Sequence, residues 1–470
     1  MTRDVSAFKA YDIRGIVPDS VNADFMRSLG KAYASVIKPK TVVIGHDARL
    51  SSEELSAALA GGFRESGVNV MDIGLCGTEM VYFATGYYRT GGGIMITASH
   101  NPKEYNGCKM VLEDAVPLGA DTGMNEIKKR VAGDGPYEHV EAETPEKKGD
   151  YNRTDITRTF LSYTLDQLSV RINQNLHVAV NSGNGAAGPT VNALSKQLPC
   201  RLTHLFSNPD GNFPNGVPNP LLPDRRADTA GAVMSHKADI GVAFDGDFDR
   251  CFFFDENGRF IEGYYIVGLL AGQVLKKNPG AKIIHDPRLT WNTIDIVKHH
   301  GGKPVESKTG HAFIKERMRQ EKAEYGGEMS AHHYFRSFWY CDTGILPFLL
   351  ILELLSTSGK KFSELVDEAI RRYPVSGEIN YTIAERADRV LGEVERSVRQ
   401  EEGAESNSSG SPAPVVSYTD GLSMEFSDWR FNLRASNTEP LLRLNVESRE
   451  NFGLMEKKRD QIAAIIKQFE

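Results

Sequence analysis

The sequence lacks the features that mark membrane-spanning, secreted or zinc-binding proteins. No stretch approaches the ~20 consecutive apolar residues of a membrane span, and Met1-Thr2-Arg3-Asp4 does not lead into the apolar core of a signal peptide. The five cysteines are odd in number and widely scattered, and no Cys-x-x-Cys pair occurs. This usage argues against a disulfide framework and a zinc site. We therefore expect a cytoplasmic protein with reduced thiols.

A large excess of charge of one sign is also missing. The chain has 55 Lys and Arg residues against 62 Asp and Glu residues, a formal net charge of -7. Such a balance gives no general attraction for nucleic acid or anionic membranes. We therefore expect neither as a partner, and an anionic ligand would have to be held by positive groups gathered locally.

The length and the order of predicted elements indicate several domains. A single hydrophobic core stops growing beyond about 250–300 residues, and this chain has 470. A strand, helix, strand order occurs three times, which predicts three related α/β domains with mixed, mostly parallel sheets. The predicted strand, helix and strand lie at 41–45, 51–66 and 68–73, at 177–180, 185–198 and 201–206, and at 282–285, 291–300 and 303–306. Ser51 and Glu54 are placed as a capping box at the start of the first of these helices.

The pattern changes after about residue 370. A predicted strand at 378–383, a charged amphipathic helix at 385–400, a strand at 441–446 and a final helix indicate a smaller C-terminal α+β domain. The segment 403–414 is rich in Gly, Ala, Ser, Asn and Pro, and we expect a mobile surface loop there. The expected domains are 1–150, 151–252, 253–370 and 371–470, with a hinge near Tyr373-Pro374.

Three aspartates at alternate positions form the first candidate site. Asp245, Asp247 and Asp249 directly follow an apolar run at 240–244. Carboxylates about 5 Å apart repel by several kcal/mol at a protein-surface dielectric unless a positive group lies between them. Hard oxygen ligands with room left for a phosphate oxygen suit Mg²⁺. The alternative is an acidic turn in which Arg250 is the internal counter-ion.

The second candidate site is Ser99, in the polar turn 97–102 that follows a predicted buried strand. The carboxyl end of a strand is the usual location of active-site residues in α/β sheets. The adjacent His100 could suggest a hydrolase, but neighbouring residues on a turn rarely face each other and the Gly-x-Ser-x-Gly elbow is absent. An ordinary polar turn is the alternative.

Together with two further segments, these motifs resemble the α-D-phosphohexomutase family. The signature segments stand in the family's order and span nearly the whole chain: Thr97-Ala98-Ser99-His100-Asn101-Pro102, the Asp245/Asp247/Asp249 loop, Gly327-Glu328-Met329-Ser330-Ala331-His332 and Arg434-Ala435-Ser436-Asn437-Thr438-Glu439-Pro440, with Phe8-Lys9-Ala10-Tyr11-Asp12-Ile13-Arg14-Gly15 as a further match. The resemblance implies a four-domain, heart-shaped enzyme around a central cleft, with one signature in each domain.

The resemblance also implies that Ser99 carries a phosphate in the resting enzyme. Magnesium would then be held by Asp245, Asp247, Asp249 and an oxygen of the phosphorylated Ser99. A phosphate adds roughly -2 charge and would be unstable beside three aspartates without a cation. The metal and the phosphoserine therefore presuppose each other.

The resemblance assigns roles to further residues. Arg434, Ser436, Asn437 and Thr438 are rich in hydrogen-bond donors and suit phosphate oxygens, although a capped turn with an incidental arginine is the alternative. The expected substrate-binding set comprises these four residues and Tyr11, Glu328, Ser330 and His332. Phosphoryl transfer needs positive groups around the transferring phosphate and a group to take the hydroxyl proton. The expected catalytic set is Ser99, His100, Lys109, Arg14, Arg250 and His311, with the general acid and base left open.

The implied reaction moves a phosphoryl group between the two ends of a hexose phosphate. Ser99 would donate its phosphate to the free end of the sugar, giving a bound glucose or mannose 1,6-bisphosphate that turns round before Ser99 recovers the other phosphate. We expect a monomer or weak homodimer. A magnesium-dependent sugar phosphatase and a non-catalytic sugar-phosphate binding protein are the alternatives from other classes.

The sugar is predicted from the segment around Met329. Glu328-Met329-Ser330 resembles family members that act on mannose phosphates, or on both mannose and glucose phosphates, whereas glucosamine-specific members usually have Gln at position 329. Ala331-His332-His333-Tyr334-Phe335 and Phe248 resemble enterobacterial members that supply GDP-mannose synthesis. We therefore expect interconversion of mannose 6-phosphate and mannose 1-phosphate, with glucose phosphates as weaker substrates.

Overall fold

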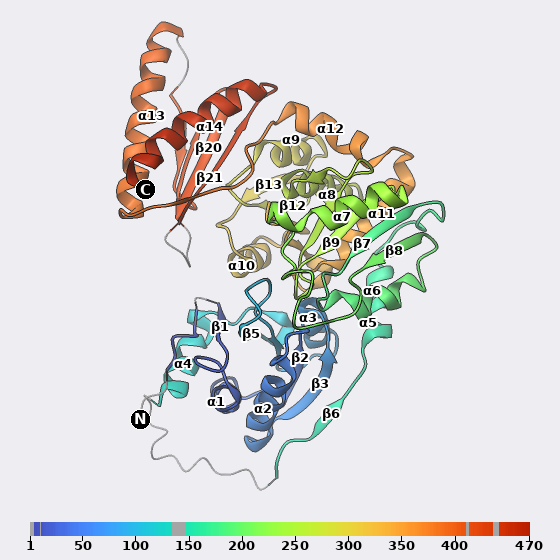
Figure 1. Ribbon diagram of the computed structural model, residues 1–470. Coiled ribbons are helices and arrows are strands. Elements are labelled where there is room, and N and C mark those ends of the chain that lie inside the picture. Colours follow the sequence, from blue (N-terminus) through green and yellow to red (C-terminus); the bar gives the residue numbers. More distant parts are fainter. Residues whose placement is uncertain (1–3, 10, 134–146, 410–412, 436–440) are drawn as a thin grey trace. The chain divides into compact units, whose positions relative to one another are not determined.

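The computed structural model describes residues 4–9, 11–133, 147–409, 413–435 and 441–470, with the backbone alone at 403–409 (Figure 1). The chain divides into two compact units. The first comprises Met1–Phe260, Met318–Gln320 and His332–Lys361, and the second comprises Ile261–Arg317, Glu321–Ala331 and Phe362–Glu470. The four expected domain ranges and the hinge near Tyr373 stay predictions.

The first unit begins with a six-stranded sheet in the order β1-β5-β4-β2-β3-β6. Strands β4, β2, β3 and β6 are parallel, β5 runs antiparallel to β4, and β1 at the edge runs antiparallel to β5. The strands are β1 (Asp12–Ile16), β2 (Thr41–His46), β3 (Asn69–Leu75), β4 (Gly92–Ile96), β5 (Tyr105–Leu112) and β6 (Tyr151–Arg153). The sheet is thus mixed and mostly parallel, as the sequence predicts.

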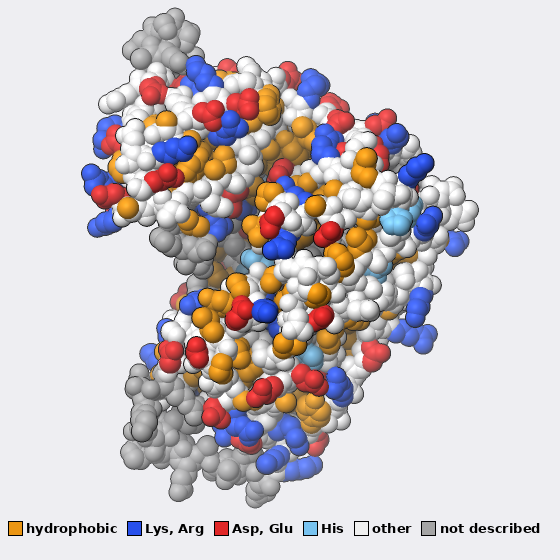
Figure 2. Space-filling model, in the orientation of Figure 1, with side chains coloured by type: hydrophobic (Ala, Val, Ile, Leu, Met, Phe, Trp, Pro, Cys, Tyr) orange, Lys and Arg blue, Asp and Glu red, His pale blue; other side chains and the backbone are white. Residues whose placement is uncertain are grey.

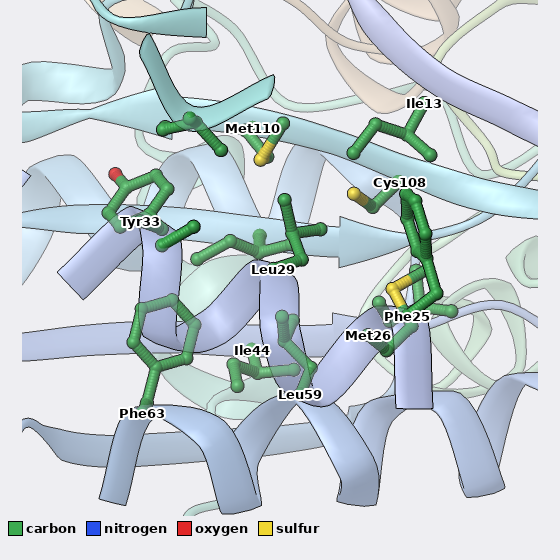
Figure 3. Close-up of a cluster of buried hydrophobic side chains, with 14 of the residues drawn as sticks. Ile13, Phe25, Met26, Leu29, Tyr33, Ile44, Leu59, Phe63, Cys108 and Met110 are labelled. Carbon is green, nitrogen blue, oxygen red and sulfur yellow. The ribbon is translucent and has the colours of Figure 1, made fainter. Parts of the chain in front are cut away.

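Helices α1 and α2 bury one face of this sheet. Figure 3 shows Leu29 and Tyr33 of α1 and Leu59 and Phe63 of α2 converging with Ile44 of β2. The start of α1 is fixed by the Asn22 side chain, which accepts a hydrogen bond from the Phe25 N–H at 3.0 Å. The helices of the first unit are α1 (Ala23–Ile37), α2 (Ser52–Glu65), α3 (Thr78–Tyr87), α4 (Met124–Ala132), α5 (Thr157–Leu165), α6 (Ala187–Ser195), α7 (Ala227–His236) and α11 (Ile345–Ser358).

A second sheet of the first unit has the order β11-β10-β9-β7-β8. Strands β9, β7 and β8 are parallel, and β10 turns back antiparallel to β9. Its strands are β7 (His177–Asn181), β8 (Arg201–Leu205), β9 (Ile240–Phe244), β10 (Cys251–Phe254) and β11 (Phe260–Ile261). The short strands β15 (His333–Phe335) and β16 (Cys341–Asp342) form an antiparallel pair in the same unit.

The second unit contains a group of parallel strands and an antiparallel C-terminal sheet. Strand β12 (Lys282–His285) pairs in parallel with β13 (Lys303–Glu306) and β14 (Tyr325–Gly327). The last sheet is antiparallel throughout, in the order β17-β21-β20-β19-β18. Its strands are β17 (Ile379–Thr382), β18 (Val415–Ser417), β19 (Leu422–Glu425), β20 (Trp429–Ala435) and β21 (Leu441–Ser448), and the helices of this unit are α8 (Gly263–Lys277), α9 (Trp291–His299), α10 (His311–Glu321), α12 (Phe362–Arg372), α13 (Ala387–Ser409) and α14 (Phe452–Ile466).

The C-terminal sheet is covered by α13 and α14, which confirms the predicted α+β domain. Val390, Val394 and Val398 recur at every fourth position of α13 and are fully buried, as the helical period requires. They pack into one core with Phe431 of β20 and Ile462 of α14. Figure 1 shows α14 lying along β20 and β21.

Two local predictions are wrong. Ser51 precedes α2, but its side chain does not cap the helix, and its hydroxyl instead accepts a hydrogen bond from Asn106 Nδ2 at 2.8 Å. The segment 403–409, predicted to be a mobile loop, continues helix α13. Glu and Ala in this stretch are good helix formers, and Lys458 of α14 bonds to Glu402 just before it. Residues 410–412 of that predicted loop lie outside the described residues.

The surface agrees with the balanced charge of the sequence. On the face drawn in Figure 2, basic and acidic side chains of the described residues are interspersed. No helix among the described residues is long and apolar enough to cross a membrane.

The core in Figure 3 gives a stability prediction. Leu59 is fully buried, whereas Leu50, nine residues earlier, is 71% exposed. Leu59→Ala leaves a cavity between α1, α2 and the first sheet, and we expect it to lower the free energy of unfolding of this part by about 3 kcal/mol. Leu50→Ala, the matched control, should change it by less than about 0.5 kcal/mol. Urea titration of both variants checks this, and equal losses would contradict the burial of Leu59.

Candidate active site

The three aspartates lie on the loop that joins β9 to the antiparallel β10. The loop is anchored by Phe248, which is fully buried and has a positive φ of 62°. The Phe248 ring meets the Phe244 ring edge to face, with centroids 4.6 Å apart. Residues other than glycine rarely adopt this left-handed region of backbone conformation. Burial of the Phe248 ring helps to stabilise the loop in this conformation.

Asp245, Asp247 and Asp249 converge, with one oxygen of each within 4.8 Å of the others. All three are at most 1% exposed. Asp247 Oδ1 and Asp249 Oδ1 are buried and have no hydrogen-bond partner among the described residues. Buried carboxylate oxygens of this kind are suited to a hard divalent cation. The residues present therefore fit the metal that the sequence pattern predicts.

Lys109 of β5 supplies a positive charge inside this cluster. Its Nζ lies 2.7 Å from Asp247 Oδ2 and 2.5 Å from Asp249 Oδ2. Burial opposes ionisation of Asp247, but the ammonium group holds the pKa of this carboxyl well below its usual range. Burial and then the charge of Asp247 raise the pKa of Asp249 to about 7. Lys109 therefore offsets part of the repulsion that the sequence predicts at these aspartates.

Ser99 lies beside the aspartates, in the turn after β4. Its Oγ is 3.2 Å from Asp245 Oδ2 and 3.0 Å from His100 Nδ1. The residue is 4% exposed and has a φ of 49°. The adjacent serine and histidine do contact each other here, contrary to our expectation for neighbours on a turn, with Ser99 in the left-handed backbone region.

Two arginines flank the Ser99 turn. Arg250 Nε donates to Asp245 Oδ2 at 2.8 Å, and its NH2 group contacts His100 Nδ1. Burial and the Arg250 charge lower the pKa of His100 well below its usual value, so this imidazole is neutral. Arg14 of β1 donates to Asn101 Oδ1 at 2.8 Å and to Asp12 Oδ2 at 2.7 Å. Arg250 is thus the counter-ion of Asp245 and at the same time part of the Ser99 surroundings.

His332 belongs to the same unit as Ser99. Its Nδ1 lies 3.0 Å from Asp342 Oδ2 and 4.0 Å from Asp249 Oδ1. A single β-bridge between His332 and Arg250 brings it to the Asp loop. His333, in contrast, is fully buried, and burial lowers its pKa to about 3. His333 is therefore a core residue.

Glu328 and Ser330 follow β14 in the second unit and are met by Arg288. The Arg288 NH2 group donates to Ser330 Oγ at 3.4 Å and lies 3.6 Å from Glu328 Oε1. The N–H of Gly310 donates to Glu328 Oε1 at 2.9 Å, which brings the start of α10 to this loop. His311 is the first residue of α10 and directly follows Gly310.

Arg434 lies at the end of β20, 6% exposed, in a group of three arginines around one carboxylate. Glu378 accepts from Arg434 NH2 at 3.3 Å, from Arg443 NH1 at 3.3 Å and from Arg288 NH1 at 3.4 Å. Burial opposes ionisation of Glu378, but Arg288 and Arg434 hold its pKa below the usual value. Arg288 also pairs with Asp286, whose Oδ2 lies 2.8 Å from its NH2 group. Guanidinium groups gathered in this way suit the oxygens of a phosphate.

Some predicted site residues stand apart from these contacts. Ser436, Asn437 and Thr438 lie outside the described residues. Tyr11 is half-buried and directly precedes β1. The structure thus gathers Ser99, His100, Lys109, Arg14, Arg250, His332 and the three aspartates in the first unit, and Glu328, Ser330, His311 and Arg434 in the second.

Sequence reasoning missed Thr78, Asp342, Arg288 and Glu378. Thr78 begins α3, and its Oγ1 donates to Asp247 Oδ2 at 2.7 Å while its N–H donates to the Asp247 carbonyl at 2.8 Å. A signal existed for two of these residues, since Thr78 and Arg288 follow the carboxyl ends of parallel strands, β3 and β12. Nothing in the local pattern marks Asp342 or Glu378.

The chain matches one family along its whole length. The matches are to phosphoglucomutase/phosphomannomutase alpha/beta/alpha domain I at residues 5–138, domain II at 159–258 and domain III at 262–373, and to the C-terminal domain at 378–465.

Curated relatives match from end to end. The phosphomannomutase of Escherichia coli strain K12 is 51% identical over 469 residues, which cover 99% of each chain. The protein named phosphohexose mutases from Xanthomonas campestris pv. campestris is 51% identical over 461 residues, 98% of this chain and 99% of its own. The phosphomannomutase of Vibrio cholerae is 49% identical over 484 residues and the whole of both chains.

Solved structures share the fold. A phosphoglucomutase/phosphomannomutase family protein from Burkholderia thailandensis is 31% identical, with a TM-score of 0.84 over 99% of this chain and 98% of its own. The N-acetylphosphoglucosamine mutase of Aspergillus fumigatus, in complex with GlcNAc-6P and magnesium, is 13% identical, with a TM-score of 0.60 over 99% and 96%. The latter likeness concerns the fold alone.

The charge balance at the Asp loop can be tested through Lys109. Lys109→Met leaves Asp247 and Asp249 buried without their ammonium partner, and we expect about 3–5 kcal/mol of destabilisation in EDTA. Added Mg²⁺ should raise the melting temperature of this variant more than that of the unmodified protein, because the cation replaces the lost charge. Lys129→Met on the exposed side of α4 is the control. Equal stability of both variants in EDTA would contradict the balance.

Proposed function

Because the chain belongs to the phosphoglucomutase/phosphomannomutase family, we propose that it interconverts mannose 6-phosphate and mannose 1-phosphate by way of a phosphorylated Ser99. Relatives that are 49–51% identical over their full length are named phosphomannomutases. The observation that carries the mechanism is the position of Ser99 Oγ, 3.2 Å from Asp245 Oδ2 at the edge of the buried acidic cluster.

The family is metal-dependent, and Asp245, Asp247 and Asp249 are the residues proposed to hold the metal, with Mg²⁺ as the ion that their oxygen atoms suit. Bound there, the ion would neutralise charge on the phosphate of Ser99. The oxygens without hydrogen-bond partners on Asp247 and Asp249 support this assignment.

The side chains around Ser99 have proposed parts in the transfer. The Oγ–P bond breaks as the free hydroxyl oxygen of the sugar bonds to phosphorus. The sugar hydroxyl proton passes to a base, and Ser99 Oγ takes up a proton as it leaves phosphorus. Lys109, Arg14 and Arg250 bring positive charge to the phosphoryl oxygens, which is what a transition state with charge spread over three oxygens requires. His100 is neutral, with its Nδ1 3.0 Å from Ser99 Oγ. Because Arg250 NH2 contacts the same nitrogen, the proposed part of His100 is to hold the Ser99 side chain in place, and the base is left open.

The second unit brings groups that suit a sugar phosphate. Glu328 and Ser330 offer acceptors and a hydroxyl for sugar hydroxyl groups. Arg434, with Arg288 and Arg443, offers guanidinium groups for a phosphate. We propose that the phosphate contacts anchor a hexose 1,6-bisphosphate whichever end it presents, so that both phosphates can be exchanged with Ser99 in turn.

A dual specificity for mannose and glucose phosphates is the second candidate. The Xanthomonas relatives, at the same 51% identity, are named phosphohexose mutases. We expect mannose phosphate to be the better substrate, with mannose 1-phosphate passing on to GDP-mannose synthesis.

The central test is the mass of the intact protein. The unmodified protein, incubated with a hexose 1,6-bisphosphate and Mg²⁺, should gain one phosphate that Ser99→Ala does not take up. Turnover of Ser99→Ala should fall by at least about a thousandfold, as expected when a covalent nucleophile is removed. Ser195→Ala, at a half-buried serine on α6 whose hydroxyl donates to the Asn192 carbonyl, is the control. A Ser99→Ala enzyme with normal turnover would contradict the mechanism.

Substrate choice is tested by kcat/KM for mannose, glucose and glucosamine 1-phosphates. We expect the mannose value to exceed the glucosamine value by at least about tenfold, since hydrogen-bonding sites discriminate strongly between a hydroxyl and its replacement. Release of inorganic phosphate, measured in the same reactions, should stay far below isomer formation. A glucosamine preference would overturn the sugar assignment, and phosphate release equal to isomer formation would favour the phosphatase.

A further inference from the structure

One buried arginine holds the backbone of the Ser99 turn from behind. Arg49 follows β2, and its side chain has no exposed surface. Its NH1 group donates to the carbonyls of Pro102 and Tyr105 at 2.7 and 2.8 Å. Its NH2 group donates to the carbonyls of Ser99 and Asn101 at 2.8 and 2.6 Å. A single guanidinium group therefore binds four carbonyls of the segment 99–105.

These contacts use every N–H of the two terminal nitrogens of Arg49. The remaining nitrogen, Nε, lies 3.3 Å from Asp47 Oδ2. This Nε faces Asp47 in an ion pair, and none of the four N–H groups on the terminal nitrogens is left for a phosphate oxygen. Arg49 is in this respect unlike Arg14 and Arg250, whose contacts are to side chains around the reacting group.

Asp47 connects Arg49 to Thr97, the residue that accepts a hydrogen bond from the Ser99 N–H. Its Oδ1 accepts from the Arg49 N–H at 3.0 Å and from Ser52 Oγ at 2.6 Å. Its Oδ2 accepts from Thr97 Oγ1 at 2.7 Å, and Thr97 Oγ1 accepts from the Ser99 N–H at 2.8 Å. The N–H and the carbonyl of Ser99 are therefore both fixed, one through Thr97 and one by Arg49.

Such a hold is needed because the φ of Ser99 is 49°, in the left-handed region that residues other than glycine rarely adopt. This conformation is also the one in which Ser99 Oγ faces Asp245. We propose that Arg49, with Asp47 and Thr97, is a positioning device that keeps Ser99 in this conformation so that its Oγ can exchange a phosphoryl group. The inference rests on the proposed function, since it concerns the same serine.

The five-residue pattern His-Asp-x-Arg-Leu occurs twice in the chain, and its arginine makes different contacts at the two places. His46-Asp47-Ala48-Arg49-Leu50 follows β2, and His285-Asp286-Pro287-Arg288-Leu289 follows β12. In both, the arginine N–H donates to the aspartate Oδ1, at 3.0 and 2.9 Å. In both, the aspartate Oδ2 holds a functional segment, through Thr97 Oγ1 or the Met329 N–H.

The two arginine side chains differ. Arg288 directs its guanidinium at Glu378 and Ser330 as well as Asp286. All the hydrogen bonds that the Arg49 guanidinium donates go to backbone carbonyls, and it also pairs with Asp47 and lies over the Phe213 ring, 5.5 Å from its centroid. The repeated pattern by itself therefore does not make the arginine bind backbone carbonyls. Only Arg49, of these two arginines, binds the Ser99 turn.

The test measures one step, phosphorylation of dephosphorylated enzyme by a hexose 1,6-bisphosphate. In that step the P–O bond to the sugar breaks, the Ser99 Oγ–P bond forms, and the serine proton ends on the released sugar oxygen. In a single-turnover experiment, Arg49→Lys should fold but lose about a hundredfold in rate, because one ammonium cannot hold four carbonyls and small misplacement of a reacting atom is costly. Binding of the bisphosphate, measured by calorimetry, should change by less than about threefold.

The control is Arg64→Met. Arg64 also donates to a backbone carbonyl, that of Gly149, but far along the chain from the Ser99 turn. It should phosphorylate at the rate of the unmodified protein. Guanidinium ion added to Arg49→Ala should restore part of the lost rate, a result that a general loss of folding would not produce. A folded Arg49→Lys that phosphorylates at the normal rate would overturn the proposal.

Should the Arg49 variants fail to fold, Thr97→Val and Thr97→Ser carry the test. Thr97→Val removes the acceptor of the Ser99 N–H at nearly constant volume and should lower the rate about tenfold, and Thr97→Ser should retain it. Equal rates for the three proteins would overturn the proposal. An unmodified protein that never takes up phosphate on Ser99 would instead sink the proposed function, and this inference with it.

Discussion

Three buried aspartates within five residues require positive charge, and much of the first unit is arranged around that need. Lys109 reaches them from β5, and Arg250 comes from their own loop. Thr78, at the start of α3, adds hydrogen bonds to Asp247. Because buried charges without partners are strongly destabilising, this cluster links the first sheet to the second. A divalent cation would complete the balance and would also bring a phosphate to the same place.

The Ser99 turn depends on this cluster on one side and on a purely structural network on the other. Asp245 lies against the hydroxyl group, and Arg49 binds the backbone behind it. An unfavourable backbone conformation persists only where its surroundings over-determine it. The turn therefore combines a strained serine with a rigid frame, as expected for a residue that must be presented to a reacting group in one orientation.

In the second unit the neighbouring side chains of like charge are arginines instead of aspartates. Arg288, Arg434 and Arg443 share the single carboxylate of Glu378. Like charges at these distances repel unless an anion lies among them. Glu378 lies among them, and Asp286 pairs with Arg288 as well. The first unit thus gathers aspartates and the second gathers arginines, each with partners of the opposite charge.

The sequence by itself determined the elements, the classes of the sheets and the residues with candidate chemistry. Apolar periodicity and strand ends are local, so β2, β7, β8 and β12 begin at the predicted residues. The Asp loop and Ser99 were recognisable from neighbouring residues for the same reason. Only the tertiary structure decided which distant groups meet them. Thr78, Arg49 and Glu378 act through contacts across 50 to 169 positions, and no local pattern encodes such pairs. The misplaced cap at Ser51 has the same cause, since Asn106 competes for its hydroxyl.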